Sequence, residues 1–150
     1  MSGIAWRCVA FDELTVSELY ALLQLRSEVF VVEQACVFQD IDGADAKAMH
    51  LLGTLDGQLV AYARCLAAGL KFTEASIGRV VTRDSIRGSG AGHELIERAI
   101  ACLAQQSGAQ AIRIGAQARL EAFYQRHGFK KAGPPYIEDA ISHIEMLRSV

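Results

Sequence analysis

Hydrophobic residues recur along the chain at intervals that predict strands and helices in turn. Residues 4–9 form an apolar-rich run typical of a first strand, and the sequence TVSE at residues 15–18 has the S/T-x-x-E form that caps the start of a helix. That helix is expected to run to about Val32. Its inward-facing positions, spaced at helical intervals, are Leu19, Leu22, Leu23, Arg26, Val29 and Phe30. Because Arg26 stands among apolar neighbours, we expect it either to extend to water or to meet an acidic partner or a ligand.

A β-hairpin is the clearest short-range prediction. Residues 50–55 and 58–66 are two apolar-rich runs separated by Asp56-Gly57, and an Asp-Gly pair suits the tight turn between antiparallel strands.

A strand, a glycine-rich turn and a helix are predicted next. Residues 77–82 are rich in β-branched side chains, whereas residues 87–92 hold three glycines in six positions and cannot continue that strand. The apolar positions that follow on one helical face are Leu95, Ile96, Ala99, Ile100 and Leu103. This helix is expected to end near Gln106.

The last part of the chain completes a mixed α/β (α+β) pattern. The expected elements are a strand at residues 111–116, a helix at 119–127 ended by Gly128, and strands at 129–132 and 143–147, with an acidic loop through Asp139. The order predicts a single domain over residues 1–150, with a largely antiparallel sheet and crossover helices.

Composition excludes several classes of protein. The 150 residues are 51% hydrophobic, and 15 basic residues against 17 acidic ones give a net charge of −2 without runs of like charge. We therefore expect neither a nucleic-acid nor a membrane partner. The N-terminus lacks the layout of a signal peptide, so a cytoplasmic location is expected. The four cysteines show no CxxC pair and no zinc spacing, which predicts reduced, structural thiols and no metal.

An acidic segment lies between the first helix and the hairpin. Asp40, Asp42 and Asp45 fall within six residues. Such a segment is either a solvated loop or a region that attracts a cationic or amine substrate.

The glycine-rich turn is the first candidate binding site. A turn that leads into a helix leaves backbone N–H groups without partners, and with the helix dipole these favour an anion such as a phosphate. A dinucleotide fingerprint needs glycine at the position of His93, and a P-loop needs glycine and then lysine at the positions of His93 and Glu94. The sequence therefore disfavours both kinds of nucleotide-binding site.

Two blocks in register resemble the GCN5-related N-acetyltransferase (GNAT) superfamily. Residues 87–92, RGSGAG, fit its acetyl-CoA signature Q/R-x-x-G-x-G/A, and residues 118–129, ARLEAFYQRHGF, are similar to its A-x-x-x-x-FY-x-x-x-GF block. The resemblance implies the GNAT fold, in which helices flank a mostly antiparallel sheet of about six to seven strands. It also implies that the sheet splays between residues 77–82 and 111–116.

The N-terminal half resembles two groups that share this fold. Residues 25–34, 39–43 and 50–53 read LRSEVFVVEQ, QDIDG and HLLG and are similar to the ElaA group of small bacterial acetyltransferases. The positions that also match acyl-homoserine-lactone synthases are Arg26, Phe30, Asp42, Asp45, Arg64 and Arg79. Those synthases are usually longer at the C-terminal end, so this is the less favoured resemblance.

The resemblance implies acetyl-CoA as cofactor and assigns residues to it. The expected cofactor contacts are Val80, Val81, Thr82, Arg87, Gly88, Ser89, Gly90, Ala91, Gly92, Gln117, Phe123 and Tyr124. An N–H group of Val80 or Val81 would polarise the thioester carbonyl, and Tyr124 would act as general acid toward the departing thiolate. Phe123 is expected to face the core more than Tyr124 does, because adjacent helical residues cannot share one face.

The proton acceptor is less defined. Glu33, His50 and His143 each have a side chain able to accept an amine proton, and we expect Glu33 and His50 as catalytic candidates. Arg26, Glu33, Asp42 and His143 are the expected substrate contacts. Ion pairs that organise the acidic segment are the expected role of Arg26, Arg64 and Arg79, rather than a part in the reaction itself.

Together these observations predict an acetyl-CoA-dependent N-acetyltransferase that uses direct transfer in a ternary complex. The acceptor would be a small-molecule amine or a peptide or protein amine, and the resemblance leaves room for a homodimer. The alternatives are an acyltransferase like the acyl-homoserine-lactone synthases and a non-catalytic module that senses acyl-CoA.

Overall fold

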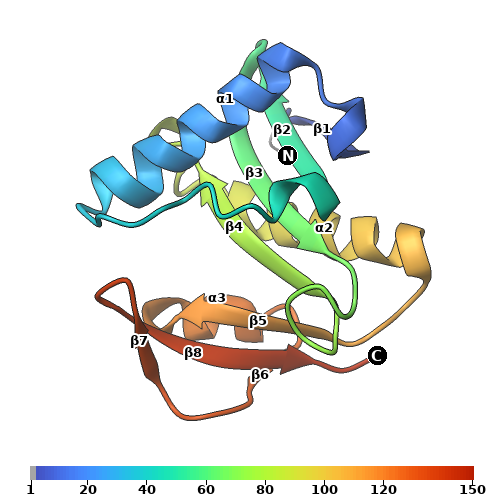
Figure 1. The fold of residues 1–150 in the computed structure, drawn as a ribbon, viewed down its shortest axis with the longest axis vertical. Helices are drawn as coiled ribbons and strands as arrows, with labels where there is room; N and C mark the ends of the chain where they lie inside the picture. Colours follow the sequence, from blue (N-terminus) through green and yellow to red (C-terminus); the bar gives the residue numbers. More distant parts are fainter. Residues whose placement is uncertain (1–2) are drawn as a thin grey trace.

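A four-stranded antiparallel meander forms the first sheet. Its strands are β1 (Ala5–Ala10), β2 (Met49–Leu55), β3 (Gln58–Leu66) and β4 (Ser76–Thr82), and each pairs with the next (Figure 1). The computed structural model describes residues 3–150, so the first two residues of the expected domain lie outside it. The predicted hairpin is confirmed, because Asp56 and Gly57 take φ values of 51° and 78° in the turn between β2 and β3.

The second sheet is built from the C-terminal part of the chain. Its strands are β5 (Ile112–Gln117), β6 (Phe129–Lys131), β7 (Tyr136–Glu138) and β8 (Ile141–Arg148), with β8 paired to the other three. β7 lies where an acidic loop was expected. The turn after it takes positive φ at Asp139 (50°) and Ala140 (64°), which lets Tyr136–Glu138 fold back onto β8 as a hairpin.

The two sheets meet at only one end, which confirms the expected splay. Ala75 forms an isolated parallel bridge with Ile112, and the N–H of Arg113 donates to the carbonyl of Ala75 at 2.8 Å. Beyond this point β4 and β5 separate. Residues 3–150 therefore form eight strands in two sheets, where about six to seven were expected.

Helices connect and cover the sheets. The main ones are α1 (Val16–Arg26), which continues as a wider π-helical segment η2 (Ser27–Glu33), then α2 (Ala91–Ser107) and α3 (Glu121–Gln125). Short 3₁₀ segments are η1 (Phe11–Glu13), η3 (Asp45–Lys47), η4 (Asp84–Ile86) and η5 (Ala118–Leu120). The predicted capping box is confirmed, because Glu18 N–H donates to Thr15 Oγ1 at 3.0 Å and Thr15 N–H donates to Glu18 Oε1 at 2.9 Å.

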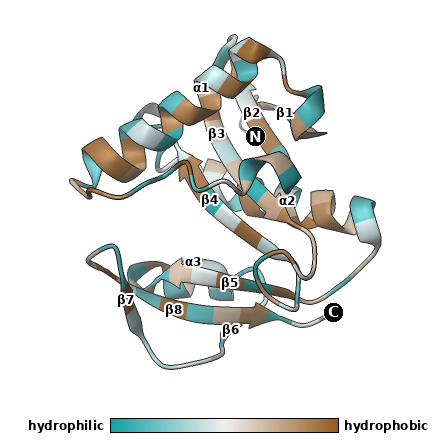
Figure 2. Ribbon diagram, in the orientation of Figure 1, coloured by the Kyte–Doolittle hydropathy of each residue, from teal (hydrophilic) through white to brown (hydrophobic). Residues whose placement is uncertain are grey.

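α1 and α2 lie on opposite faces of the first sheet (Figure 1). On the α1 face, Leu22 and Leu25 pack with Tyr62 and Val81. The α2 face holds the larger apolar core, which continues onto the second sheet. Hydrophobic residues are abundant along α1 and the strands it covers (Figure 2). β3 is buried on both faces because it lies between these two layers.

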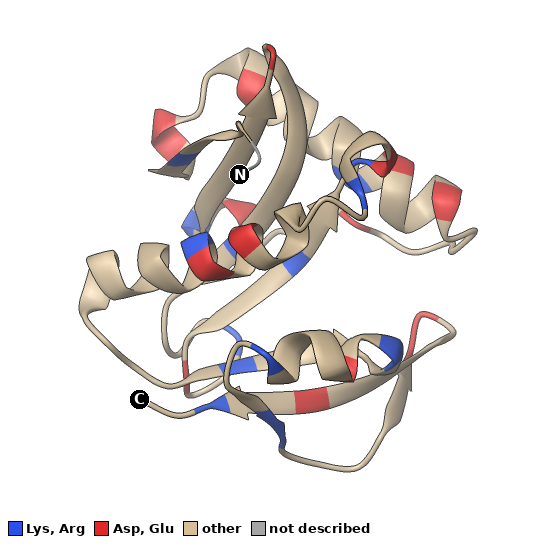
Figure 3. Ribbon diagram, turned by 180° about the vertical axis from the view of Figure 1, so that it is seen from behind, with Lys and Arg blue, Asp and Glu red and all other residues tan. Residues whose placement is uncertain are grey.

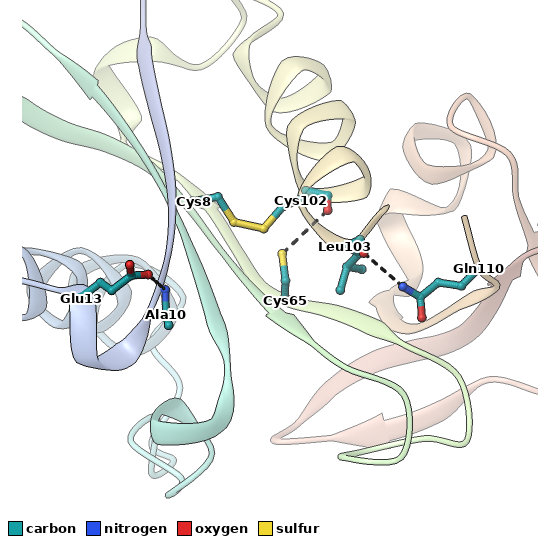
Figure 4. Close-up of a disulfide and its surroundings, with 8 residues drawn as sticks. Cys8, Ala10, Glu13, Cys65, Cys102, Leu103 and Gln110 are labelled. Carbon is teal, nitrogen blue, oxygen red and sulfur yellow. Dashed lines mark hydrogen bonds between the residues drawn. A yellow bond between two sulfur atoms is a disulfide. The ribbon is translucent and has the colours of Figure 1, made fainter. Parts of the chain in front are cut away.

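The expectation of four reduced cysteines is wrong for one pair. Cys8 of β1 and Cys102 of α2 form a disulfide, with their Cα atoms 6.4 Å apart (Figure 4). Their separation of 94 positions in the sequence hid the pairing, which arises because α2 packs across the sheet that contains β1. Cys36 and Cys65 are free and buried.

Charged positions of both signs are interspersed over the ribbon (Figure 3). Within residues 3–150, no helix has both the length and the apolar character needed to cross a bilayer. The same residues contain no group of three or more side chains arranged to hold a metal ion.

Candidate functional site

The separation of β4 from β5 opens a cleft of about 460 Å³. Its walls come from η2, from β4 and β5, and from α3 and β8. At one end the wall includes Arg87 and Gly92, which belong to the glycine-rich turn and the start of α2. The fold therefore brings both sequence blocks, residues 87–92 and 118–129, to one cavity.

The glycine-rich turn is shaped by left-handed backbone at two positions. Gly88 and Gly90 have φ values of 83° and 87°, and Gly90 occupies the N-cap of α2. A Cβ built on either glycine would meet no heavy atom within 4 Å, so the space beside the turn is open. Residues 88–91 stand beside the cleft rather than in its wall. An open turn at the positive end of a long helix suits an anionic group such as a pyrophosphate.

β4 offers its free backbone edge to the cleft. β3 pairs with one edge of β4, and the splay leaves the other edge beside the cavity. The register shifts near Arg79, which takes a φ of 50° and interrupts the regular ladder. Val80, Val81 and Thr82 all line the cleft, as expected. Edge N–H and C=O groups of this kind can pair with an extended ligand.

Tyr124 and Phe123 both line the cleft, but their relative burial is opposite to the prediction. Tyr124 is 6% exposed, whereas Phe123 is half-buried. Phe123 stacks on His93 with ring centroids 4.6 Å apart and covers Gly92, while Tyr124 packs edge-on against Phe129. Burial raises the pKa of Tyr124 to about 12, so its phenol keeps its proton through the neutral range.

Glu33 and Arg87 line the cleft as an ion pair. Arg87 donates to both carboxylate oxygens of Glu33, one of them at 3.1 Å, and also to the carbonyl of Thr82 at 2.9 Å. The hydrogen bonds from Arg87 lower the pKa of Glu33. Glu33 therefore stays ionised and paired in this structure, which makes it a weak candidate for a proton acceptor.

His143 and Gln117 face the cleft from the second sheet. They are directly paired across β8 and β5, and both line the cavity. His143 Nδ1 lies 2.8 Å from the carbonyl oxygen of Ile141. Gln117 donates to Gln34 Oε1 at 3.3 Å, which links the second sheet to the segment after η2.

Three of the expected catalytic and substrate-contact residues lie outside the cleft wall. Arg26 and His50 are fully buried, and Asp42 is bound to arginines. His50 uses both ring nitrogens, with Nδ1 2.6 Å from the hydroxyl of Tyr62 and Nε2 2.8 Å from the carbonyl of Asp45, and burial lowers its pKa. The roles of Arg26 in substrate binding and of His50 in catalysis are therefore corrected, because neither side chain is accessible to a substrate.

Arginines organise the acidic segment, as the sequence favoured. Arg26 reaches Asp40 at 2.9 Å and Asp45 at 2.8 Å. Arg64 binds both carboxylate oxygens of Asp42 at 2.8 Å. Arg79 adds a contact to Asp40 at 2.8 Å. The three aspartates are thus neutralised by three arginines, and a direct role for Asp42 in substrate binding loses its basis.

Sequence reasoning missed part of the cleft wall. The missed side chains that come from irregular segments and from the β7–β8 hairpin are Gln34, Cys36, Phe38, Lys71, Glu138, Asp139 and Ile141. The thiol of Cys36 contacts the carbonyl of Asp139 at 2.9 Å across 103 residues of sequence. No local periodicity signals such a contact.

Comparison with known proteins agrees with this geometry. A model of the acetyltransferase (GNAT) domain matches residues 17–150. Protein ElaA of Escherichia coli K12 is 43% identical over 149 residues, covering 98% of this chain and 97% of ElaA. The crystal structure of Escherichia coli ElaA has a TM-score of 0.91 at 42% identity, covering 97% of this chain and 99% of that one.

Two further solved structures are informative. An acyl-CoA N-acyltransferase from Pseudomonas aeruginosa has a TM-score of 0.93 at 44% identity, covering 97% of this chain and 99% of that one. The acyl-homoserine-lactone synthase LasI has a TM-score of 0.76 at 19% identity, covering 99% of this chain and 91% of that one, which shows a shared fold only.

Proposed function

Because the chain belongs to the GNAT acetyltransferase family, we propose that it transfers an acetyl group from acetyl-CoA directly to an amine in a ternary complex. Residues 1–150 would act as one catalytic domain. The observation that carries the proposal is the cleft between β4 and β5, which extends from the glycine-rich turn at the start of α2 to a buried phenol, that of Tyr124.

The residues present fit acetyl-CoA. Gly88 and Gly90 leave open space beside the N-terminus of α2, where the pyrophosphate would be held by backbone N–H groups of residues 88–92. The free edge of β4 would pair with the pantetheine arm. Arg87 would add positive charge once its pairing with Glu33 is exchanged for the phosphate. When bound, the thioester supplies an activated acetyl group.

The cleft residues have separate roles in this proposal. Val80 or Val81 would donate a backbone N–H to the thioester oxygen, where negative charge develops. Tyr124 would donate its phenolic hydrogen to the departing sulfur, and its raised pKa keeps that hydrogen in place beforehand. Gln117 and Phe123 would line the same channel.

The acceptor would enter from the side lined by η2 and the β7–β8 hairpin. Glu33 and His143 line this region, so both remain candidates for contact with a small-molecule or peptide amine. The fold shared with LasI favours testing longer acyl-CoA donors as the second candidate activity.

Cofactor binding is tested first by thermal shift with acetyl-CoA. The parent protein is expected to melt at a higher temperature with acetyl-CoA, whereas Gly90→Glu should lose this shift because the side chain would fill the anion site. Gly57→Glu is the matched control, since Gly57 also combines a positive φ with open space but lies in the turn between β2 and β3, away from the start of α2. The absence of a shift in the parent, or an unchanged shift in Gly90→Glu, would contradict the proposal.

Turnover is tested by following CoA release with a panel of amines and peptides, using acetyl-CoA and long-chain acyl-CoA donors in parallel. Tyr124→Phe should lower kcat by about 10²–10⁴-fold, the range typical of a lost general acid. Preference for long-chain donors would favour the synthase-like alternative. Cofactor binding without turnover on any amine would favour a sensor of acyl-CoA.

A further inference from the structure

The imidazole of His143 is held with one defined nitrogen available to the cleft. Nδ1 lies 2.8 Å from the carbonyl oxygen of Ile141, two residues earlier on β8. A carbonyl oxygen can only accept a hydrogen bond, so Nδ1 carries the hydrogen. In the neutral ring the lone pair is then on Nε2, which makes Nε2 the basic atom. Within residues 3–150, no group forms a hydrogen bond with Nε2.

Neighbouring strands fix the orientation of this ring. His143 is directly opposite Gln117 of β5 and Tyr136 of β7. The Tyr136 ring stacks on it with centroids 5.6 Å apart and an interplanar angle of 23°. His143 is only 9% exposed, yet it lines the cleft. A buried, stacked ring with an unpaired basic nitrogen is positioned to receive a proton from a group in the cavity.

The other candidate proton acceptors are used elsewhere. Glu33 is paired with Arg87, and His50 is enclosed by Tyr62 and Asp45 outside the cleft. His143 is the single imidazole in the cleft wall formed by residues 3–150.

Few charges surround His143 on the strands packed against it. Glu138 ends β7 and, with Asp139, forms the acidic hairpin tip seen in red in Figure 3. Glu145 lies two residues along β8 and is paired with Arg113 of β5 at 3.0 Å. Tyr136 is the other titratable group, and burial raises its pKa, so it stays neutral.

We propose that Nε2 of His143 accepts a proton from the ammonium form of the acceptor amine, an inference that rests on the acetyl transfer proposed above. Once Nε2 has taken this first proton, the freed amine nitrogen bonds to the acetyl carbon as the carbon–sulfur bond breaks. The thiolate takes the phenolic proton of Tyr124, and the nitrogen loses its second proton to solvent. Solvent then restores the proton of Tyr124 and takes the proton of His143, so the net reaction converts an ammonium group and a thioester to an amide, a thiol and one proton.

The ring tautomer is tested without turnover. In ¹⁵N-histidine-labelled free protein, long-range ¹H–¹⁵N correlation spectra should show neutral His143 with hydrogen on Nδ1 and an unprotonated Nε2. His143→Gln identifies its signals among the four histidines. Hydrogen on Nε2 in the neutral form would overturn the proposal.

Kinetics then tests the chemical role. The probes are an alkylamine from the turnover panel, which is protonated at neutral pH, and hydroxylamine, which is not. His143→Gln should lower kcat/KM for the alkylamine by about 10²–10⁴-fold and remove the acidic limb of its pH profile. The hydroxylamine reaction should change by less than about tenfold, because its nitrogen is already uncharged. Ser142→Ala, an exposed neighbour of His143 on β8 that lies outside the cleft wall, serves as the control, with little change expected.

The two possible failures are distinguishable. A parent protein that is active on the alkylamine, with a His143→Gln variant of equal activity and unchanged pH profile, would overturn the inference alone. A parent that acetylates no amine would overturn the proposed function and this inference together.

Discussion

At the scale of single residues, Arg26 shows how the fold accommodates a buried charge. A guanidinium with 0% exposure is tolerated because Asp40 and Asp45 satisfy its donors, and Tyr62 places its ring 5.8 Å from the guanidinium carbon. The same aspartates also bind Arg64 and Arg79. Removing one member therefore leaves partners that are buried and unpaired.

Arg26→Met is expected to lower the free energy of unfolding by about 3–5 kcal/mol, the usual cost of breaking a buried ion pair. Urea unfolding at neutral pH measures this change. Arg7→Met is the control, because Arg7 pairs with Glu18 at the surface with its side chain 51% exposed. The control should cost less than about 1 kcal/mol. Similar losses in both variants would contradict the role assigned to Arg26.

The aspartates also predict how stability depends on pH. Hydrogen bonds from Arg64 hold the pKa of Asp42 well below its usual range. Burial alone would raise the pKa of Asp45, but its hydrogen bonds with Arg26 outweigh this and lower it. The folded-state pKa values thus lie below the unfolded value of about 3.9. This stabilisation is complete above the unfolded value and is lost as the pH falls below it.

Asp42→Asn removes one of these carboxyl groups and should give a shallower acid dependence. The free energy of unfolding, measured from about pH 6 down to about pH 2.5, should fall less steeply in the variant than in the parent. Parallel curves for the two proteins would show that Asp42 has an ordinary pKa.

At the scale of elements, α2 belongs both to the candidate site and to the packing of the first sheet. Its N-terminus carries the glycine turn beside the cleft, and its body packs against the first sheet and is joined to β1 by the Cys8–Cys102 disulfide. Cys65 of β3 lies beside the same helix, with its thiol 3.9 Å from the carbonyl of Ala99 (Figure 4). The position of the cofactor turn therefore depends on how this helix is held.

The disulfide is expected to contribute about 2–4 kcal/mol to the free energy of unfolding, because it restricts the unfolded chain over a long sequence separation. The double variant Cys8→Ala/Cys102→Ala should lose this amount in urea unfolding. Reductant should destabilise the parent and leave the double variant unchanged, which provides the control. If the parent keeps its full free energy of unfolding when Cys8 and Cys102 are both reduced, the disulfide does not make this contribution.

At the scale of the whole molecule, one apolar core joins two sheets that diverge at the surface. Ile77 of β4 and Ile114 of β5 belong to the same core, although the strands are bridged only at Ala75 and Ile112. The cleft is thus a consequence of the splay. Its two walls come from different halves of the chain, so a ligand held between them should stabilise both.

Acetyl-CoA at about 100 times its dissociation constant is expected to raise the free energy of unfolding by about 2.7 kcal/mol. Hydrogen exchange should slow most at the amides of β4 and the first turn of α2, and less at β1, which lies away from the cleft. Gly90→Glu should abolish both effects. Protection confined to other elements would contradict the proposed binding mode.

The sequence predicted most elements and part of the candidate site. The hairpin around Asp56 and the capping box at Thr15 were confirmed because a few adjacent residues specify each of them. The strand β7 was missed, since three residues beside an acidic turn show no clear alternation. The expected location in the cytoplasm and the expected amine acceptor remain predictions.

Taken alone, the sequence determined the features that depend on neighbouring residues: the strand, glycine turn and helix around Gly90, and the two blocks that mark the family. Tertiary structure alone decided which side chains are accessible. It buried Arg26 and His50, paired Cys8 with Cys102, and placed His143 beside the cleft. Local patterns specify backbone conformation and apolar faces, whereas burial and charge pairing arise between residues that only packing brings together.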